Sequence, residues 1–130
     1  MNNENNNWYQ MLKKSKLTPP PIVFPIVWSF LYMTMVVSLA TYIYNVGLTN
    51  PLGLTFFIIQ LILNLSWSPV FFRFRRPDIS LMIVLLMLVF IFLTIWQFLK
   101  VSPISGYILI PYLVWVSLAS YLNFYIWMNN

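Results

Sequence analysis

The residues that could support chemistry are few, because most of the usual catalytic types are missing. The chain of 130 residues contains no cysteine and no histidine, and its only carboxylates are Glu4 and Asp78. A thiolate nucleophile, a thiolate metal site and a disulfide framework are therefore excluded. Neither carboxylate lies inside a long apolar run, so we expect no acid–base pair, no metal site and no resident cofactor.

The remaining candidates are amide and aromatic side chains at helical spacing. Gln60, Asn64 and Trp67 recur at i, i+4 and i+7, which places them on one helix face. Amides in hydrocarbon are costly without partners, so this face should point inward. Hydrogen bonding between helices is one interpretation, and a polar anchor in a ligand cavity is the other. The pattern favours the first for Gln60 and leaves both open for Asn64.

Two further tryptophans lie well inside apolar stretches. Trp28 lies deeper than a residue at the membrane interface, and Trp115 shares a helix face with the small Ala119. An indole N–H in a dry interior requires an acceptor and could orient a polar ligand group. Packing is the commoner role of such residues. Ala119 would let either another helix or a flat ligand approach closely.

Four apolar runs must position these side chains. They cover residues 22–44, 54–72, 79–99 and 107–127. Each is long enough for an α-helix to cross about 30 Å of hydrocarbon. Hydrophobic residues make up 61% of the chain and charged residues 7%, far below the quarter or so of soluble proteins. We predict an all-α integral membrane protein with a bundle of four transmembrane helices, the third being the most exposed to lipid.

The residues outside the runs define the ends of this bundle. Residues 1–7 form a polar tail that we expect to be disordered. Residues 8–21 form an amphipathic approach to the membrane, and residues 22–130 form the bundle. Pro25, Pro69 and Pro111 fall within the runs, where each removes a backbone hydrogen bond and tends to kink a helix.

Basic residues indicate how the bundle is oriented. Six of the seven lie on one side of an alternating topology: Lys13, Lys14, Lys16, Arg73, Arg75 and Arg76. This split predicts that the N-terminus, the loop at Arg73–Arg76 and the C-terminus are cytoplasmic. We expect these charges to contact anionic lipid headgroups, and not nucleic acid.

Three blocks of sequence resemble one known family. They are the stretch from Trp8 to Tyr32 with its TPP and VFPIVWSFLY segments, QLILNLSWSPVFF from Gln60 to Phe72, and PYLVWVSLASYLNFYIW from Pro111 to Trp127. Their order and spacing are similar to those of the tryptophan-rich sensory protein family. This family is also called the translocator protein or peripheral-type benzodiazepine receptor family.

The resemblance implies a helical bundle whose cavity binds tetrapyrroles such as protoporphyrin, or other flat hydrophobic ligands. It implies ligand-binding roles for Trp28, Asn64 and Trp115, for Trp67 as an aromatic cavity residue, and for Tyr9 and Pro19 in a loop that caps the cavity. Some family members degrade protoporphyrin in light and oxygen. If this chain does so, the resemblance implies Trp28 and Trp115 as the catalytic residues.

The sequence also departs from the family. Family members have five transmembrane helices, and the predicted bundle corresponds to that of the family without the first. The open wall would be filled by lipid or by a neighbouring subunit, which favours a homodimer. The alternative is that the sequence is a truncated piece or begins at a wrongly assigned start. The family's C-terminal sterol motif requires a basic residue after Leu122 and Tyr125, and none follows.

The residues inside the four runs can be weighed against three possible functions of the protein. A sensor or translocator for tetrapyrroles fits the aromatic and amide residues best, and a light-dependent porphyrin-degrading enzyme is the alternative. A small multidrug exporter would require a carboxylate within the membrane to exchange protons for substrate. None of the four runs contains one.

Overall fold

The computed structural model describes residues 12, 14, 16–20, 22–49 and 51–130. Tyr9 and the polar tail predicted for residues 1–7 lie outside the described residues. The elements are α2 (Val23–Val46), α3 (Pro51–Ser68), the π-helical turn η1 (Pro69–Arg73), α4 (Pro77–Val101), α5 (Pro103–Ile108) and α6 (Ile110–Asn129). Two of the spans are composite, since η1 continues α3 and α6 follows α5 after one residue. The described part therefore has four helical segments long and apolar enough to cross a membrane, which confirms the predicted fold class.

Prolines and one glycine set the helix boundaries. Pro51, Pro77 and Pro103 are each the first residue of a helix. Proline suits this position because its fixed φ matches the helix and its missing N–H would have had no partner there. Helix α2 ends at Gly47, which has a φ of 76° and donates its N–H to the carbonyl of Ile43 at 2.7 Å. Glycine adopts this left-handed conformation without steric cost.

The three prolines inside the runs have three different effects. Pro25 lies in the first turn of α2, where no intrahelical hydrogen bond is lost. Pro69 starts η1, in which the N–H of Phe74 reaches back to the carbonyl of Pro69 at 3.1 Å. Pro111 follows the break between α5 and α6. The helices therefore depart from regular α-helical geometry at Pro69 and just before Pro111, but not at Pro25.

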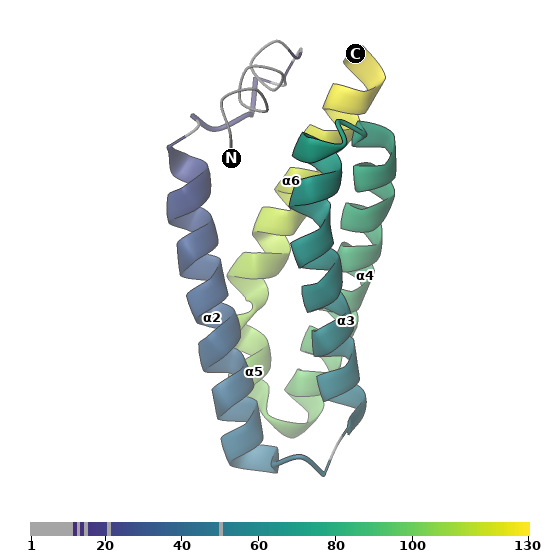
Figure 1. Cartoon of the computed structure of the whole chain (residues 1–130). Coiled ribbons are helices and arrows are strands. Elements are labelled where there is room, and N and C mark those ends of the chain that lie inside the picture. Colours follow the sequence, from purple (N-terminus) through teal and green to yellow (C-terminus); the bar gives the residue numbers. More distant parts are fainter. Residues whose placement is uncertain (1–11, 13, 15, 21, 50) are drawn as a thin grey trace.

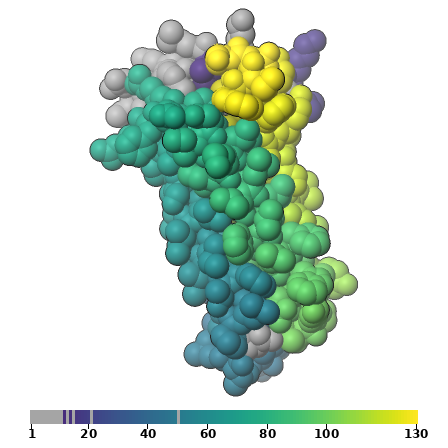
Figure 2. Space-filling model, turned by 90° about the vertical axis from the view of Figure 1, so that its right-hand side faces the viewer, coloured from purple at the N-terminus to yellow at the C-terminus, as the bar shows by residue number. Residues whose placement is uncertain are grey.

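Helix α4 is the central helix of the bundle. It packs against α3 along its length and also contacts α5 and α6, as Figures 1 and 2 show. In its most apolar stretch 39% of the residues are buried, compared with 17% in α2. The expectation that this third span is the most exposed to lipid is therefore wrong. Apolar residues such as Val84, Met87 and Ile91 make up most of its buried face, which also carries the polar Ser80, Thr94 and Gln97.

Helix α2 packs against the bundle mainly through its C-terminal half, which contacts α5 (Figure 1). The ring of Tyr42 stacks on that of Phe98 with centroids 4.2 Å apart. Ser38 donates a hydrogen bond of 2.7 Å to the carbonyl of Ser105. Asn45 donates another, of 3.0 Å, to the hydroxyl of Ser102. The N-terminal half of α2, which carries Trp28, has fewer contacts and reaches the other helices through aromatic rings.

Candidate functional site

An aromatic cluster joins the N-terminal half of α2 to α6. The ring of Trp28 meets that of Trp115 at a centroid distance of 6.4 Å and an interplanar angle of 88°. It lies 6.5 Å from Tyr112 and 5.8 Å from Tyr32. Phe24 meets Trp115 at 5.8 Å. The contacts of Trp115 with Trp28 and Phe24, and of Trp28 with Tyr112, are edge-to-face, the arrangement that aromatic quadrupoles prefer, whereas Trp28 and Tyr32 are tilted by 35°. Two of the three tryptophans predicted from the sequence as ligand contacts are thus brought together.

A chain of hydrogen bonds lies directly beside this cluster. Tyr32 donates its hydroxyl to Oδ1 of Asn64, and Nδ2 of Asn64 donates to the hydroxyl of Tyr112 at 2.7 Å. Tyr112 in turn donates to Oε1 of Gln60 at 2.7 Å. Gln60 therefore makes the contact between helices that the sequence favours for it. Asn64 is also engaged through both ends of its amide, with only 5% of its surface exposed.

The indole N–H of Trp115 is different, because it has no partner in the described part of the chain. Its Nε1 atom is buried and makes no hydrogen bond. A buried donor left unpaired costs about 1–3 kcal/mol, which is why such groups are rare. A hydrogen-bond acceptor placed beside Trp28 and Phe24 could remove this cost.

Trp67 belongs to a second cluster nearer the basic end of the bundle. Its Nε1 donates to Oδ1 of Asn123 at 2.9 Å, and its ring stacks on Phe71 with centroids 5.1 Å apart. Asn123 also accepts a hydrogen bond of 3.0 Å from Ser80 and donates one of 2.9 Å to the carbonyl of Pro77. This amide therefore ties α3, α4 and α6 together, and the polar atom of Trp67 is used within the protein.

Pro19 and Ala119, the other predicted site residues that the structure describes, are both partly buried. Pro19 is half-buried in the segment that leads into α2, and Ala119 is half-buried one turn after Trp115. Tyr32 and Tyr112, which link the aromatic cluster to the amides, are not among the residues predicted from the sequence. Only helical spacing indicates them, since Tyr32 follows Trp28 by four residues and Tyr112 precedes Trp115 by three.

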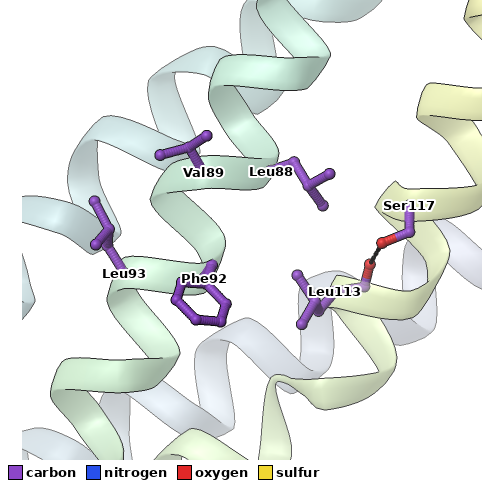
Figure 3. Close-up of a pocket in the computed structure, with 6 residues that line it drawn as sticks. All are labelled: Leu88, Val89, Phe92, Leu93, Leu113 and Ser117. Carbon is purple, nitrogen blue, oxygen red and sulfur yellow. Dashed lines mark hydrogen bonds between the residues drawn. The ribbon is translucent and has the colours of Figure 1, made fainter.

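A groove with a volume of about 390 Å³ lies on another face, between α4 and α6 (Figure 3). It is lined by Leu88, Val89, Phe92, Leu93, Leu113 and Ser117. The hydroxyl of Ser117 is already bonded to the carbonyl of Leu113 at 2.8 Å, as the dashed line shows. The groove thus presents an apolar surface, and none of the predicted ligand-binding residues lines it.

Charged groups gather at the end of the bundle where α3 leads through η1 to α4. Arg73, Arg75 and Arg76 are all exposed there. Arg76 donates to both carboxylate oxygens of Asp78, at 3.1 and 2.9 Å. These hydrogen bonds raise the pKa of the Arg76 guanidinium above its ordinary value. At the other end of α4, Lys100 lies 3.6 Å above the ring of Trp96.

Comparison with known proteins gives a single family. A model described as the TspO/MBR family matches residues 1–128. The "Tryptophan-rich protein TspO" of Chlorobaculum tepidum is 41% identical over 125 residues, covering 95% of this chain and 79% of the relative. "Protein CrtK" of Rhodobacter capsulatus is 36% identical over 126 residues, covering 95% and 78%. The human "Translocator protein" is 33% identical over 134 residues, covering 98% and 77%.

Proposed function

This chain belongs to the TspO/MBR family of membrane proteins, and we propose that it binds a flat, largely apolar ligand of the tetrapyrrole class as a sensor or translocator. The proposed site is the aromatic cluster of Trp28, Tyr32, Tyr112 and Trp115. The names of its relatives, tryptophan-rich sensory protein and translocator protein, support the general role. The ligand class is the part that requires a test.

The unpaired indole N–H of Trp115 is the observation that carries the proposal. The neighbouring amides of Asn64 and Gln60, by contrast, are engaged in hydrogen bonds between helices. A hydrogen-bond acceptor on the ligand, such as a carboxylate or carbonyl oxygen, would give the indole N–H of Trp115 the partner that it lacks. The adjoining edge-to-face rings of Trp28 and Phe24 offer apolar surface to a flat ligand body.

We propose a different role for Asn64, since its amide already bonds to Tyr32 and Tyr112. It would orient these two tyrosines beside Trp28, and so shape the site that the ligand meets. Trp67 would act in the same indirect way, since Asn123 holds its N–H. Pro19 and Ala119 would border the site by shape alone.

The test is a titration of the purified protein in lipid nanodiscs with protoporphyrin IX, followed by the absorbance of the porphyrin itself. Trp115→Phe removes the N–H and keeps an aromatic ring. We expect its affinity to fall about 10- to 100-fold, the value of a hydrogen bond to a charged acceptor. Trp28→Phe should cost about 2- to 10-fold through lost ring contact.

Trp96→Phe and Trp127→Phe are the matched controls. Both side chains are nearly half exposed, at 47% and 45%, and neither belongs to the cluster. Their affinities should stay within twofold of the wild type. The site is wrongly placed if the control substitutions weaken binding as much as those at Trp28 and Trp115. The ligand class is wrong if the wild-type protein does not shift the porphyrin absorbance at all.

Porphyrin degradation in light is the second candidate, and the contacts among the rings favour it. The photoexcited porphyrin would give one electron to dioxygen, forming superoxide and a porphyrin radical cation, and combination of these two would add both oxygen atoms to the macrocycle. Trp115, Trp28 and Tyr32 form a chain with centroids 6.4 and 5.8 Å apart, over which the radical cation could be shared. Illumination with and without protein measures this directly, and bleaching no faster than in empty nanodiscs excludes it.

We also propose that the end carrying Arg73, Arg75 and Arg76 faces the cytoplasm and contacts anionic lipid. Six of the seven basic residues favour that side, and η1 and the C-terminal end of α6 lie at the same end of the bundle in Figure 1. A homodimer remains a prediction. The low burial of α2 supports it by leaving apolar surface for a partner.

A further inference from the structure

The groove between α4 and α6 opens toward the surface that the bilayer covers. Val89 and Phe92, which line it from α4, are 53% and 59% exposed. Leu113 and Ser117 line it from α6, and Figure 3 shows Leu88 and Phe92 on the side of α4 that faces them. Both helices belong to spans long and apolar enough to cross a membrane, so the groove meets lipid tails and not bulk water.

The groove offers its occupant apolar contact and no unpaired polar side chain. The hydroxyl of Ser117 already donates to the carbonyl of Leu113, and the other lining side chains are apolar. A polar ligand group placed inside the groove would lose its hydrogen bonds at a high cost. An acyl chain requires apolar contact alone, and therefore fits this lining.

A cation lies on the same face of α4, at the end of the helix that leads to α5. Trp96 and Lys100 follow Val89 by seven and eleven residues, which aligns the three side chains along the helix. Trp96 and Lys100 are both exposed, with the ammonium group over the indole ring. Asp78, the one acidic side chain among the described residues, lies at the other end of α4 and bonds to Arg76. No described carboxylate therefore neutralises Lys100.

The distance between the groove and this cation matches one leaflet of a bilayer. The eleven residues from Val89 to Lys100 extend over about 17 Å of helix. Half of the hydrocarbon core is about 15 Å thick. A phospholipid with its headgroup at Lys100 therefore brings the deep part of its acyl chain to the groove. Trp96 lies one turn deeper than Lys100, where an indole suits the boundary between headgroups and tails.

We propose that the groove binds one phospholipid with a net negative headgroup, its acyl chain lying between α4 and α6 and its headgroup on Lys100. This lipid belongs to the leaflet at the Lys100 end of the bundle. It is distinct from the lipid contacts proposed for Arg73, Arg75 and Arg76 at the opposite end. No residue of the aromatic cluster lines the groove, so the inference holds or fails independently of porphyrin binding.

The experiment measures lipid preference at one position of the full chain in bilayers. Val114→Cys, beside the groove on α6, carries a single bimane label because the chain has no cysteine. Brominated phosphatidylglycerol and brominated phosphatidylcholine with identical chains quench this label when they lie next to it. Phosphatidylglycerol should be favoured about fivefold, the value of one lysine near an anionic headgroup. Val36→Cys on α2 is the matched control, since the two valines are 67% and 64% exposed, and its label should report equal quenching.

Two kinds of variant separate the headgroup from the groove. Lys100→Gln should lower the preference at the Val114 label to about one, and Lys100→Arg should keep it. Ser117→Phe fills the groove from an exposed position and should also lower the preference to about one, as should Val89→Phe from α4. Adding Lys100→Gln to Ser117→Phe should then change nothing further, because one lipid joins the two positions. If SDS unfolding shows that one groove variant is not folded, the other decides.

Three results would overturn the inference. Equal quenching by both lipids in the wild type would show that the headgroup is not selected. A preference that persists in the folded groove variants would mean that Lys100 attracts headgroups without any chain in the groove. Weak quenching by both lipids at Val114, compared with Val36, would mean that another occupant, such as a second copy of the chain, covers the groove.

Discussion

Replacing Tyr112 by phenylalanine should destabilise the bundle more than the same change at Tyr32. Tyr112 is 1% exposed, and its hydroxyl serves two amides, accepting from Asn64 and donating to Gln60 at 2.7 Å each. Tyr32 is 37% exposed and makes a single bond, to Asn64. Tyr112→Phe therefore leaves two buried amide atoms without their partner, whereas Tyr32→Phe leaves one, Oδ1 of Asn64.

The magnitude depends on the membrane setting. Hydrogen bonds between transmembrane helices contribute about 0.6 kcal/mol on average and about 1.7 kcal/mol at most, because the unfolded chain in lipid also finds partners. Two lost bonds at a fully buried position then give a loss of about 1–3 kcal/mol for Tyr112→Phe. The single bond of Tyr32 gives about 0.5 kcal/mol.

Unfolding of the purified variants in detergent by increasing SDS would measure these losses. Tyr121→Phe is the control, since Tyr121 is an exposed tyrosine of α6 and its loss should stay within about 0.5 kcal/mol. The double variant of Tyr32 and Tyr112 should lose less than the sum of the single losses, because both hydroxyls bond to Asn64. An equal or larger loss for Tyr32→Phe, or strict additivity, would refute this account of the network.

Two further predictions concern the packing of α2 and the orientation of the bundle. A Cβ at Gly53 would lie 3.0 Å from the hydroxyl of Tyr42 and 3.2 Å from the ring of Phe98, so Gly53→Ala should destabilise the protein by about 1–3 kcal/mol in the same SDS assay; a neutral result would show that these rings shift freely. The chain has no cysteine, so Lys16→Cys and Ile104→Cys can each be labelled alone. In intact cells a membrane-impermeant maleimide should label the second and not the first, and the reverse pattern would invert the proposed topology.

The four spans could be predicted from the sequence because the bilayer imposes a length and an apolar composition on every helix that crosses it. The position of α4 could not. Most residues on both the packed face and the lipid face are apolar, so Val84 and Val89 look alike in sequence although the first is buried and the second is exposed. Hydrophobic patterning therefore locates spans but does not say which of them is central.

The polar residues of the site were only partly predictable for a related reason. Gln60 and Asn64 stood out as amides in hydrocarbon, whereas Tyr112 read as one more apolar residue of its run. Its hydroxyl is nevertheless the group that joins both amides. Asn123 could have been selected on the same grounds as Asn64, since it too is an amide inside an apolar run. Its spacing from Trp67 on a different helix, however, carried no signal in the sequence.

Hydrogen-bond satisfaction separates the structural residues from the candidates for ligand contact. In hydrocarbon a polar group without a partner in the protein has no water to bond to, so it is costly unless a ligand bonds to it. Asn64 and Trp67 have partners within the protein, which gives them sufficient reason to be present without a ligand. Trp115 lies inside a membrane span and has none in the described part of the chain. Substitutions at Asn64 and Trp67 should therefore act chiefly on stability, and those at Trp115 chiefly on ligand affinity. A Trp115→Phe protein that is no less stable than the wild type but binds porphyrin more weakly would fit this division, and one that unfolds more easily with unchanged affinity would contradict it.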